Sequence, residues 1–103
     1  MEEKELALHW QVMYNRKPEL AEKVTAWRTQ LTEDETIPRK YKELMMLAMA
    51  CVIRYPEGIR THAGYARANG ASEEELYAAV AQTMTIGGIP AYRVGINTLQ
   101  ELW

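Results

Sequence analysis

Several features that would identify a function are scarce or absent in this chain of 103 residues. Its single cysteine, Cys51, excludes an internal disulfide and a cluster of thiolate metal ligands. The longest apolar run, Leu44 to Ile53, is too short to cross a hydrocarbon core of about 30 Å, so no membrane partner is expected. A net charge of −2 and the lack of a Lys/Arg stripe argue against nucleic acid as a partner. The acidic start, Met1-Glu2-Glu3-Lys4-Glu5, has the wrong charge for a signal or transit peptide, and we expect a cytoplasmic protein.

The patterns that are present predict a helical domain. The composition, 48% hydrophobic and 25% charged, is that of a globular protein, and the length fits a single domain over residues 1–103. Apolar residues recur at helical spacing, and no stretch shows the two-residue alternation of a strand. Prolines and glycines fall mostly between these periodic segments, and Ser72 with Glu75 matches a capping box. We therefore expect an all-α, compact bundle of about six helices, at residues 3–16, 18–31, 38–54, 56–68, 72–86 and 90–103.

The expected helix at 38–54 is unusual because its segment Leu44 to Ile53 has no polar face. A helix that is apolar around its whole circumference has to be covered on all sides. Its methionines, Met45, Met46 and Met49, suit contacts with a partner because their side chains pack adaptably. We expect a homo-oligomer in which a second copy completes the cover. The alternative is a central core helix in a monomer.

Two polar residues flank the apolar segment, Glu43 before it and Arg54 after it. At about 100° per residue they return to nearly the same direction, so both are expected on the stripe of Leu47 and Ala50. The next helix turns back antiparallel, which brings His62 within about one helical turn of Glu43. A carboxylate beside an imidazole can move a proton at neutral pH. The alternative is a purely structural hydrogen-bonded pair, or a half-exposed histidine with no partner.

The same residues belong to an ordered series of motifs. The series consists of Tyr41-Lys42-Glu43-Leu44, the small-residue helix after it, His62, Asn69-Gly70-Ala71-Ser72-Glu73-Glu74-Glu75-Leu76, and Gly87-Gly88-Ile89-Pro90-Ala91. It resembles the carboxymuconolactone decarboxylase family, which includes the alkylhydroperoxidase D branch, over about Leu20 to Leu99. The resemblance implies an alkylhydroperoxidase D-like fold around a central antiparallel helical hairpin. It also implies assembly as a trimer or hexamer.

The peroxidase branch of the family combines a Glu, a Cys-x-x-Cys pair and a His in a proton relay to a redox dithiol. In this chain Glu43 and His62 match the acid and the histidine, but Tyr55 and Gly58 occupy the cysteine positions. A dithiol peroxidase needs one thiolate to attack and a second thiol to resolve the product. We expect Cys51 to be an unreactive core residue, because burial raises the pKa of a thiol. A dithiol peroxidase is therefore not expected.

The decarboxylase branch also lacks the cysteine pair, so the resemblance implies a cofactor-independent lyase that acts on a small organic acid or lactone. In this reading Glu43 and His62 are catalytic, His62 as acid and base and Glu43 as its orienting partner. Arg54, Arg93 and Tyr55 are the candidate substrate-binding residues, since an arginine can hold a carboxylate bidentately. No cofactor or metal is expected, and His9 lacks a second histidine at helical spacing. The alternatives are a family member with a degenerate redox site and a non-catalytic oligomeric binding protein.

Overall fold

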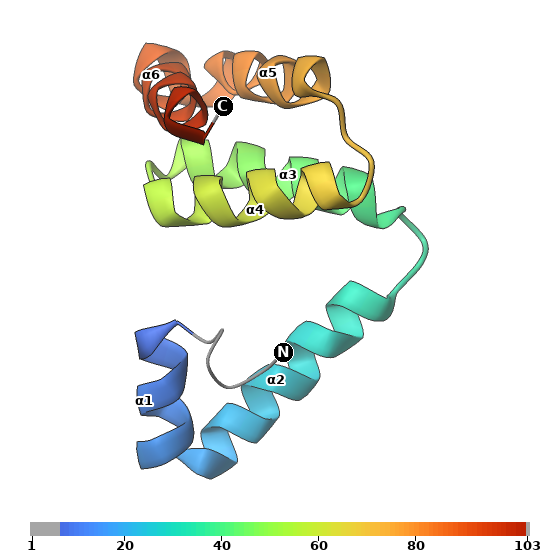
Figure 1. Cartoon of the computed structure of the whole chain (residues 1–103), viewed down its shortest axis with the longest axis vertical. Coiled ribbons are helices and arrows are strands. Elements are labelled where there is room, and N and C mark those ends of the chain that lie inside the picture. Colours follow the sequence, from blue (N-terminus) through green and yellow to red (C-terminus); the bar gives the residue numbers. More distant parts are fainter. Residues whose placement is uncertain (1–6, 103) are drawn as a thin grey trace. The chain divides into compact units, whose positions relative to one another are not determined.

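The computed structural model describes residues 7–102, which form six helices and no strand (Figure 1). The predicted all-α fold is thus confirmed. By its internal contacts the chain divides into two compact units, Met1–Glu35 and Thr36–Trp103. The single domain over residues 1–103 stays a prediction. The predicted helix ends at residues 3–6 and at 103 lie outside the described residues.

The first unit is a helical hairpin of α1 (Leu8–Arg16) and α2 (Pro18–Glu33). Pro18 begins α2 as predicted, because proline fits the first helical turn, where its missing N–H is not needed. The hairpin encloses very little, since Ala21 is the only buried residue on its two helices. Three large apolar side chains of α2, those of Leu20, Trp27 and Leu31, are exposed, Trp27 by 61%.

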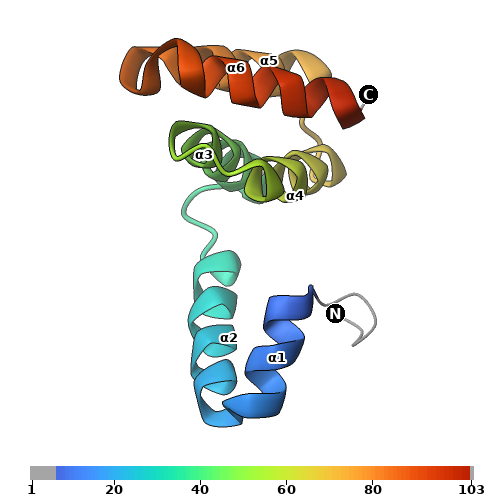
Figure 2. The same ribbon diagram turned by 90° about the vertical axis from the view of Figure 1, so that its left-hand side faces the viewer.

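The second unit contains α3 (Arg39–Val52), α4 (Pro56–Ala68), α5 (Glu73–Gln82) and α6 (Met84–Leu102). Helices α3 and α4 make the most extensive contact, as the predicted antiparallel hairpin, and α5 and α6 cover one face of it (Figures 1 and 2). Each helix contributes small or aliphatic side chains to one core between these two layers. The core residues are Leu47, Ala50, Cys51, Ile59, Ala63, Ala66, Ala71, Leu76, Val80, Ala91 and Leu99.

Local signals explain most of the helix boundaries in this unit. The predicted capping box is confirmed, since the Glu75 amide donates to Ser72 Oγ at 3.1 Å and the Ser72 amide donates to Glu75 Oε1 at 2.9 Å. The chain leaves α4 through Gly70, whose φ of 97° is costly for any residue with a Cβ. Both features lie between α4 and α5, where they end one helix and begin the next.

The boundary between α5 and α6 differs from the prediction. Helix α5 ends at Gln82 rather than at residue 86, and α6 begins at Met84 rather than at Pro90. The turn comes earlier because Thr83 Oγ1 donates to the Val80 carbonyl at 2.6 Å and the Thr83 amide bonds the same carbonyl. Met84, which falls inside the predicted fifth helix, is the first residue of α6 and is 38% exposed. The predicted break at the glycine pair is present inside α6, where Gly88 has φ 71° and ψ −172°.

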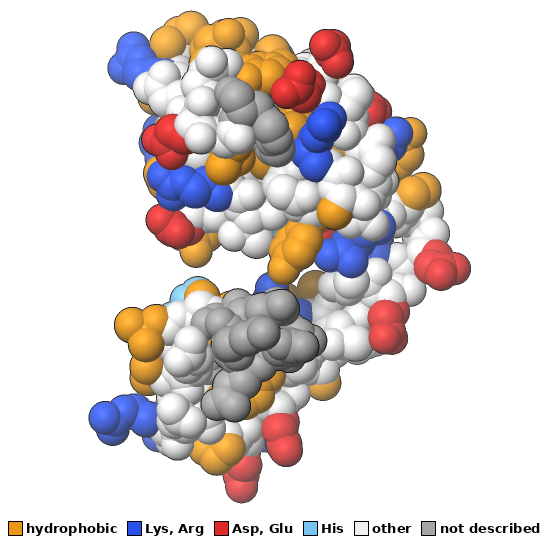
Figure 3. Space-filling view, in the orientation of Figure 1, with side chains coloured by type: hydrophobic (Ala, Val, Ile, Leu, Met, Phe, Trp, Pro, Cys, Tyr) orange, Lys and Arg blue, Asp and Glu red, His pale blue; other side chains and the backbone are white. Residues whose placement is uncertain are grey.

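Helix α3 is only partly covered by the rest of the chain. Leu47, Ala50 and Cys51 are buried, whereas Met49 is 55% exposed and Ile53, just after the helix, is 70% exposed. Apolar side chains reach the surface of each unit (Figure 3).

Within residues 7–102, no helix combines the length and apolar character that crossing a bilayer demands.

Candidate functional site at the α3–α4 hairpin

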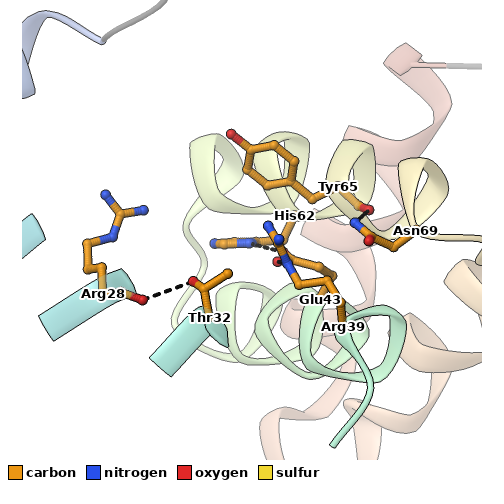
Figure 4. Close-up of polar contacts among 7 residues, drawn as sticks. All are labelled: Arg28, Thr32, Arg39, Glu43, His62, Tyr65 and Asn69. Atoms are coloured by element: carbon orange, nitrogen blue, oxygen red, sulfur yellow. Dashed lines mark hydrogen bonds and ion pairs between the residues drawn. The ribbon is translucent and has the colours of Figure 1, made fainter. Parts of the chain in front are cut away.

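The central group of the site is the carboxylate of Glu43, in the second turn of α3. Its side chain is 2% exposed, which is costly for a charged group unless it is paired and hydrogen-bonded. Both oxygens have a partner: Arg39 Nε donates to Oε2 at 2.6 Å, and His62 Nδ1 lies 2.7 Å from Oε1 (Figure 4). The predicted approach of Glu43 and His62 is therefore a direct hydrogen bond.

His62, in the middle of α4, faces the carboxylate with one ring nitrogen and leaves the other available. With a carboxylate as its partner, the Nδ1 of a neutral imidazole carries the proton, and Nε2 then presents a lone pair. Nε2 makes no hydrogen bond within the described residues. Every buried side-chain nitrogen or oxygen in that part of the chain has a partner, so Nε2 is accessible, in keeping with a side chain that is 23% exposed.

Arg39 is the site residue that sequence reasoning missed. It is the first residue of α3 and lies one helical turn before Glu43, on the same face, which is the spacing at which an ion pair forms on a helix. That spacing was the signal that could have identified it. Its side chain is 38% exposed, and its two terminal nitrogens make no hydrogen bond within the described residues.

Tyr65, one turn beyond His62 on α4, completes the group. Its ring centroid lies 6.3 Å from that of His62 and 5.5 Å from the guanidinium carbon of Arg39. The second distance is within the range of a cation–π contact. Asn69 Nδ2 donates to the Tyr65 carbonyl at 2.8 Å and so ties down the end of α4. Figure 4 shows Glu43 and His62 meeting between α3 and α4, with Arg39 and Tyr65 close to them.

The structure does not bring the predicted substrate-binding residues to this group. Helix α3 ends at Val52, so the predicted stripe does not continue to Arg54, whose φ is 58°. The guanidinium of Arg54 instead donates to the carbonyls of Val52 at 2.6 Å and Gly87 at 3.1 Å. Arg54 therefore ties the end of α3 to α6, at the opposite end of the helix from Arg39.

Arg93 and Tyr55 also lie elsewhere. Arg93 is exposed on α6, two residues and about 200° from both Ala91 and Gly95 on the buried face. It makes no hydrogen bond or ion pair within the described residues. Tyr55 is the residue before α4, and its ring packs so closely on Gly58 that a Cβ there would lie 2.6 Å from the ring. Where the peroxidase branch has its cysteines, this chain has a tight aromatic–glycine contact.

Cys51 is a core residue, as predicted. Its side chain is fully buried, and desolvation by burial raises the pKa of its thiol to about 11. Two observations thus remove thiol chemistry from the site: the cysteine positions hold Tyr55 and Gly58, and the single thiol stays protonated in the core. No cluster of three or more metal-ligating side chains occurs within residues 7–102.

Comparison with known proteins identifies one family. The sequence model of the carboxymuconolactone decarboxylase family matches residues 18–101, from the start of α2 almost to the end of α6. No curated protein and no solved structure matches the chain.

Proposed function

The chain belongs to the carboxymuconolactone decarboxylase family, and we propose that it is a cofactor-independent lyase that acts on a small organic acid or lactone. The observation that carries the proposal is the hydrogen bond from His62 Nδ1 to the buried Glu43 carboxylate, with Nε2 left accessible. This arrangement fixes the tautomer and the orientation of the imidazole, which is what an acid–base catalyst requires.

The proposed chemistry needs one proton, which is delivered to the carbon that loses the carboxylate. When a carboxylate leaves as carbon dioxide, the electron pair of the broken C–C bond stays on the neighbouring carbon, which then takes up a proton. His62 Nε2 delivers that proton, and the Glu43 carboxylate stabilises the imidazolium that exists before delivery. Water restores the proton to Nε2 at the end of the cycle.

A residual peroxidase function has no support in the site. A thiol peroxidase requires a thiolate that peroxide can reach. The Cys51 thiol is fully buried, and its pKa is raised to about 11 by burial. The acid–base proposal instead depends on His62, which is paired through Nδ1 and accessible at Nε2.

The test compares two histidine variants, His62→Gln and His9→Gln, because the chain contains two histidines. Turnover of a panel of lactone acids is followed by release of carbon dioxide. We expect His62→Gln to lower kcat by roughly 10²- to 10⁴-fold, the usual contribution of a general acid or base. His9 is exposed on α1, and His9→Gln should retain the kcat of the unmodified protein. Equal kcat for both variants would reject the mechanism, and binding of these acids without turnover would indicate a binding protein.

We also propose that the protein is a homo-oligomer, a trimer or hexamer. The support is a stripe of exposed apolar residues at a spacing of four along and just beyond α3, namely Tyr41, Met45, Met49 and Ile53. Analytical ultracentrifugation tests this assembly. Met49→Lys, which places a charge in the stripe, should dissociate the oligomer, whereas Lys42→Met on the same helix should not. A monomeric unmodified protein at micromolar concentration would contradict the proposal.

A further inference from the structure

The guanidinium of Arg39 has more hydrogen-bond donors than the structure uses. An arginine carries five N–H donors, and here only the one on Nε is engaged, by Glu43 Oε2. The terminal nitrogens make no hydrogen bond within the described residues, and the side chain is 38% exposed. The ion pair with Glu43 therefore holds the side chain in place while its end stays free for an anion.

The free end of Arg39 lies beside the catalytic nitrogen because both residues bind the same carboxylate. Arg39 Nε contacts Oε2 at 2.6 Å and His62 Nδ1 contacts Oε1 at 2.7 Å, so the guanidinium and the imidazole flank Glu43. The Tyr65 ring lies close to both, as Figure 4 shows. An anion held by the terminal nitrogens of Arg39 is thus a near neighbour of His62 Nε2.

The local charges favour an anion at this place. Glu43 is fully paired and almost completely buried, so its charge is opposed by Arg39 and turned away from solvent. A guanidinium whose orientation is already fixed loses little conformational entropy on binding, and its planar fork matches the two oxygens of a carboxylate. The same geometry gives no advantage to a neutral ligand.

We propose that Arg39 is the substrate-binding residue of this site and holds a carboxylate of the substrate through its terminal nitrogens. The inference rests on the proposed function, because only that function makes the bound anion a substrate, and it names the residue that holds the carboxylate. It assigns to Arg39 the role that the sequence suggested for Arg54 and Arg93. The two oxygens of the carboxylate contact the terminal nitrogens of Arg39, and the carbon that receives the proton faces His62 Nε2.

The test measures binding rather than turnover, with benzoate as the probe and benzamide as its neutral counterpart. Two-dimensional NMR of the imidazole nitrogens reports binding near His62 in the folded protein. We expect benzoate, but not benzamide, to shift the His62 signals. Arg39→Gln should weaken benzoate binding about 10- to 100-fold, the value of a charge-assisted pair. Arg39→Lys keeps the charge but lacks the fork, and it should weaken binding by a smaller factor.

Arg60→Gln is the matched control. Arg60 lies on α4 and is as exposed as Arg39, but it pairs with Glu57 and Glu101. Its loss should leave benzoate binding unchanged. Benzoate binding that is equal in the Arg39→Lys protein, the Arg39→Gln protein and the unmodified protein would overturn the assignment. Arg39-dependent binding of benzoate without turnover of any acid would refute the proposed lyase and leave the anion site standing.

Discussion

Gly95 provides a sharp test of how closely the helices behind the site are packed. It lies on the buried face of α6, where an added Cβ would be 2.6 Å from Val80 Cγ1 and 2.8 Å from Cys51 Sγ. Both neighbours are fully buried and neither has a flexible end that could swing away. Such overpacking costs about 1–3 kcal/mol, and the better helix propensity of alanine returns about 1 kcal/mol. We therefore expect Gly95→Ala to lower the free energy of unfolding by up to about 2 kcal/mol.

The matched control is Gly64→Ala in the middle of α4, where an added Cβ meets nothing within 4 Å. This change should raise the free energy of unfolding by about 0.5–1 kcal/mol, because only the helix propensity changes. Both variants are unfolded in urea at one protein concentration, with circular dichroism as the signal. Val80→Ala in the Gly95→Ala protein removes the nearest clash, so the double variant should lose less stability than the two single losses added together. Equal effects of the two glycine substitutions would refute the close approach of α3, α5 and α6.

Four further predictions concern Cys51, Gly88 and Ser72. At pH 8 roughly one Cys51 thiol in a thousand is ionised, against about one in ten for the ordinary pKa of 9, so a thiol reagent should label the protein only on unfolding. Because folding keeps this thiol protonated, its contribution to stability is complete below pH 9 and is lost as the pH rises towards 11, which urea unfolding across this range would detect. Gly88→Ala forces a Cβ into φ 71° and ψ −172°, and thermal unfolding should show a loss of about 1–3 kcal/mol. Ser72→Ala removes the side-chain acceptor for the Glu75 amide and should cost about 1 kcal/mol, whereas Ser72→Asp should retain most of the stability.

The helix order was predictable because its signals are local. Pro18 and Pro56 begin helices where the sequence placed them, and the Ser72–Glu75 pair forms both of its hydrogen bonds. The end of α5 was not predictable in the same way. It depends on Thr83, whose hydroxyl competes for a backbone carbonyl only when the local chain already bends.

The contact between Glu43 and His62 was predictable because a short link joins two antiparallel helices, so a count of residues fixes which side chains are level. The count failed for Arg54 because it assumed that α3 continues to that residue. The structure ends the helix at Val52 and turns the chain through a left-handed residue. Arg39 was not predicted although its spacing from Glu43 is local, because ion pairs at this spacing are common on helices and the sequence does not show that Glu43 is buried.

The pairing of the charges of Glu43, Arg39 and His62 determines which of their nitrogen atoms face solvent. Glu43 is the only buried acidic residue among those described, and burial of an ion pair often stabilises a fold no more than apolar packing would. The donors of the pair that face solvent are hydrated whatever the role of the pair, and they are the atoms that a ligand can reach. Here the acceptor is satisfied twice, while Arg39 and His62 each keep nitrogen atoms free on the accessible side. The cluster therefore presents solvent-facing donors and a base around a fixed carboxylate, the arrangement on which the proposed binding and protonation of an acid depend.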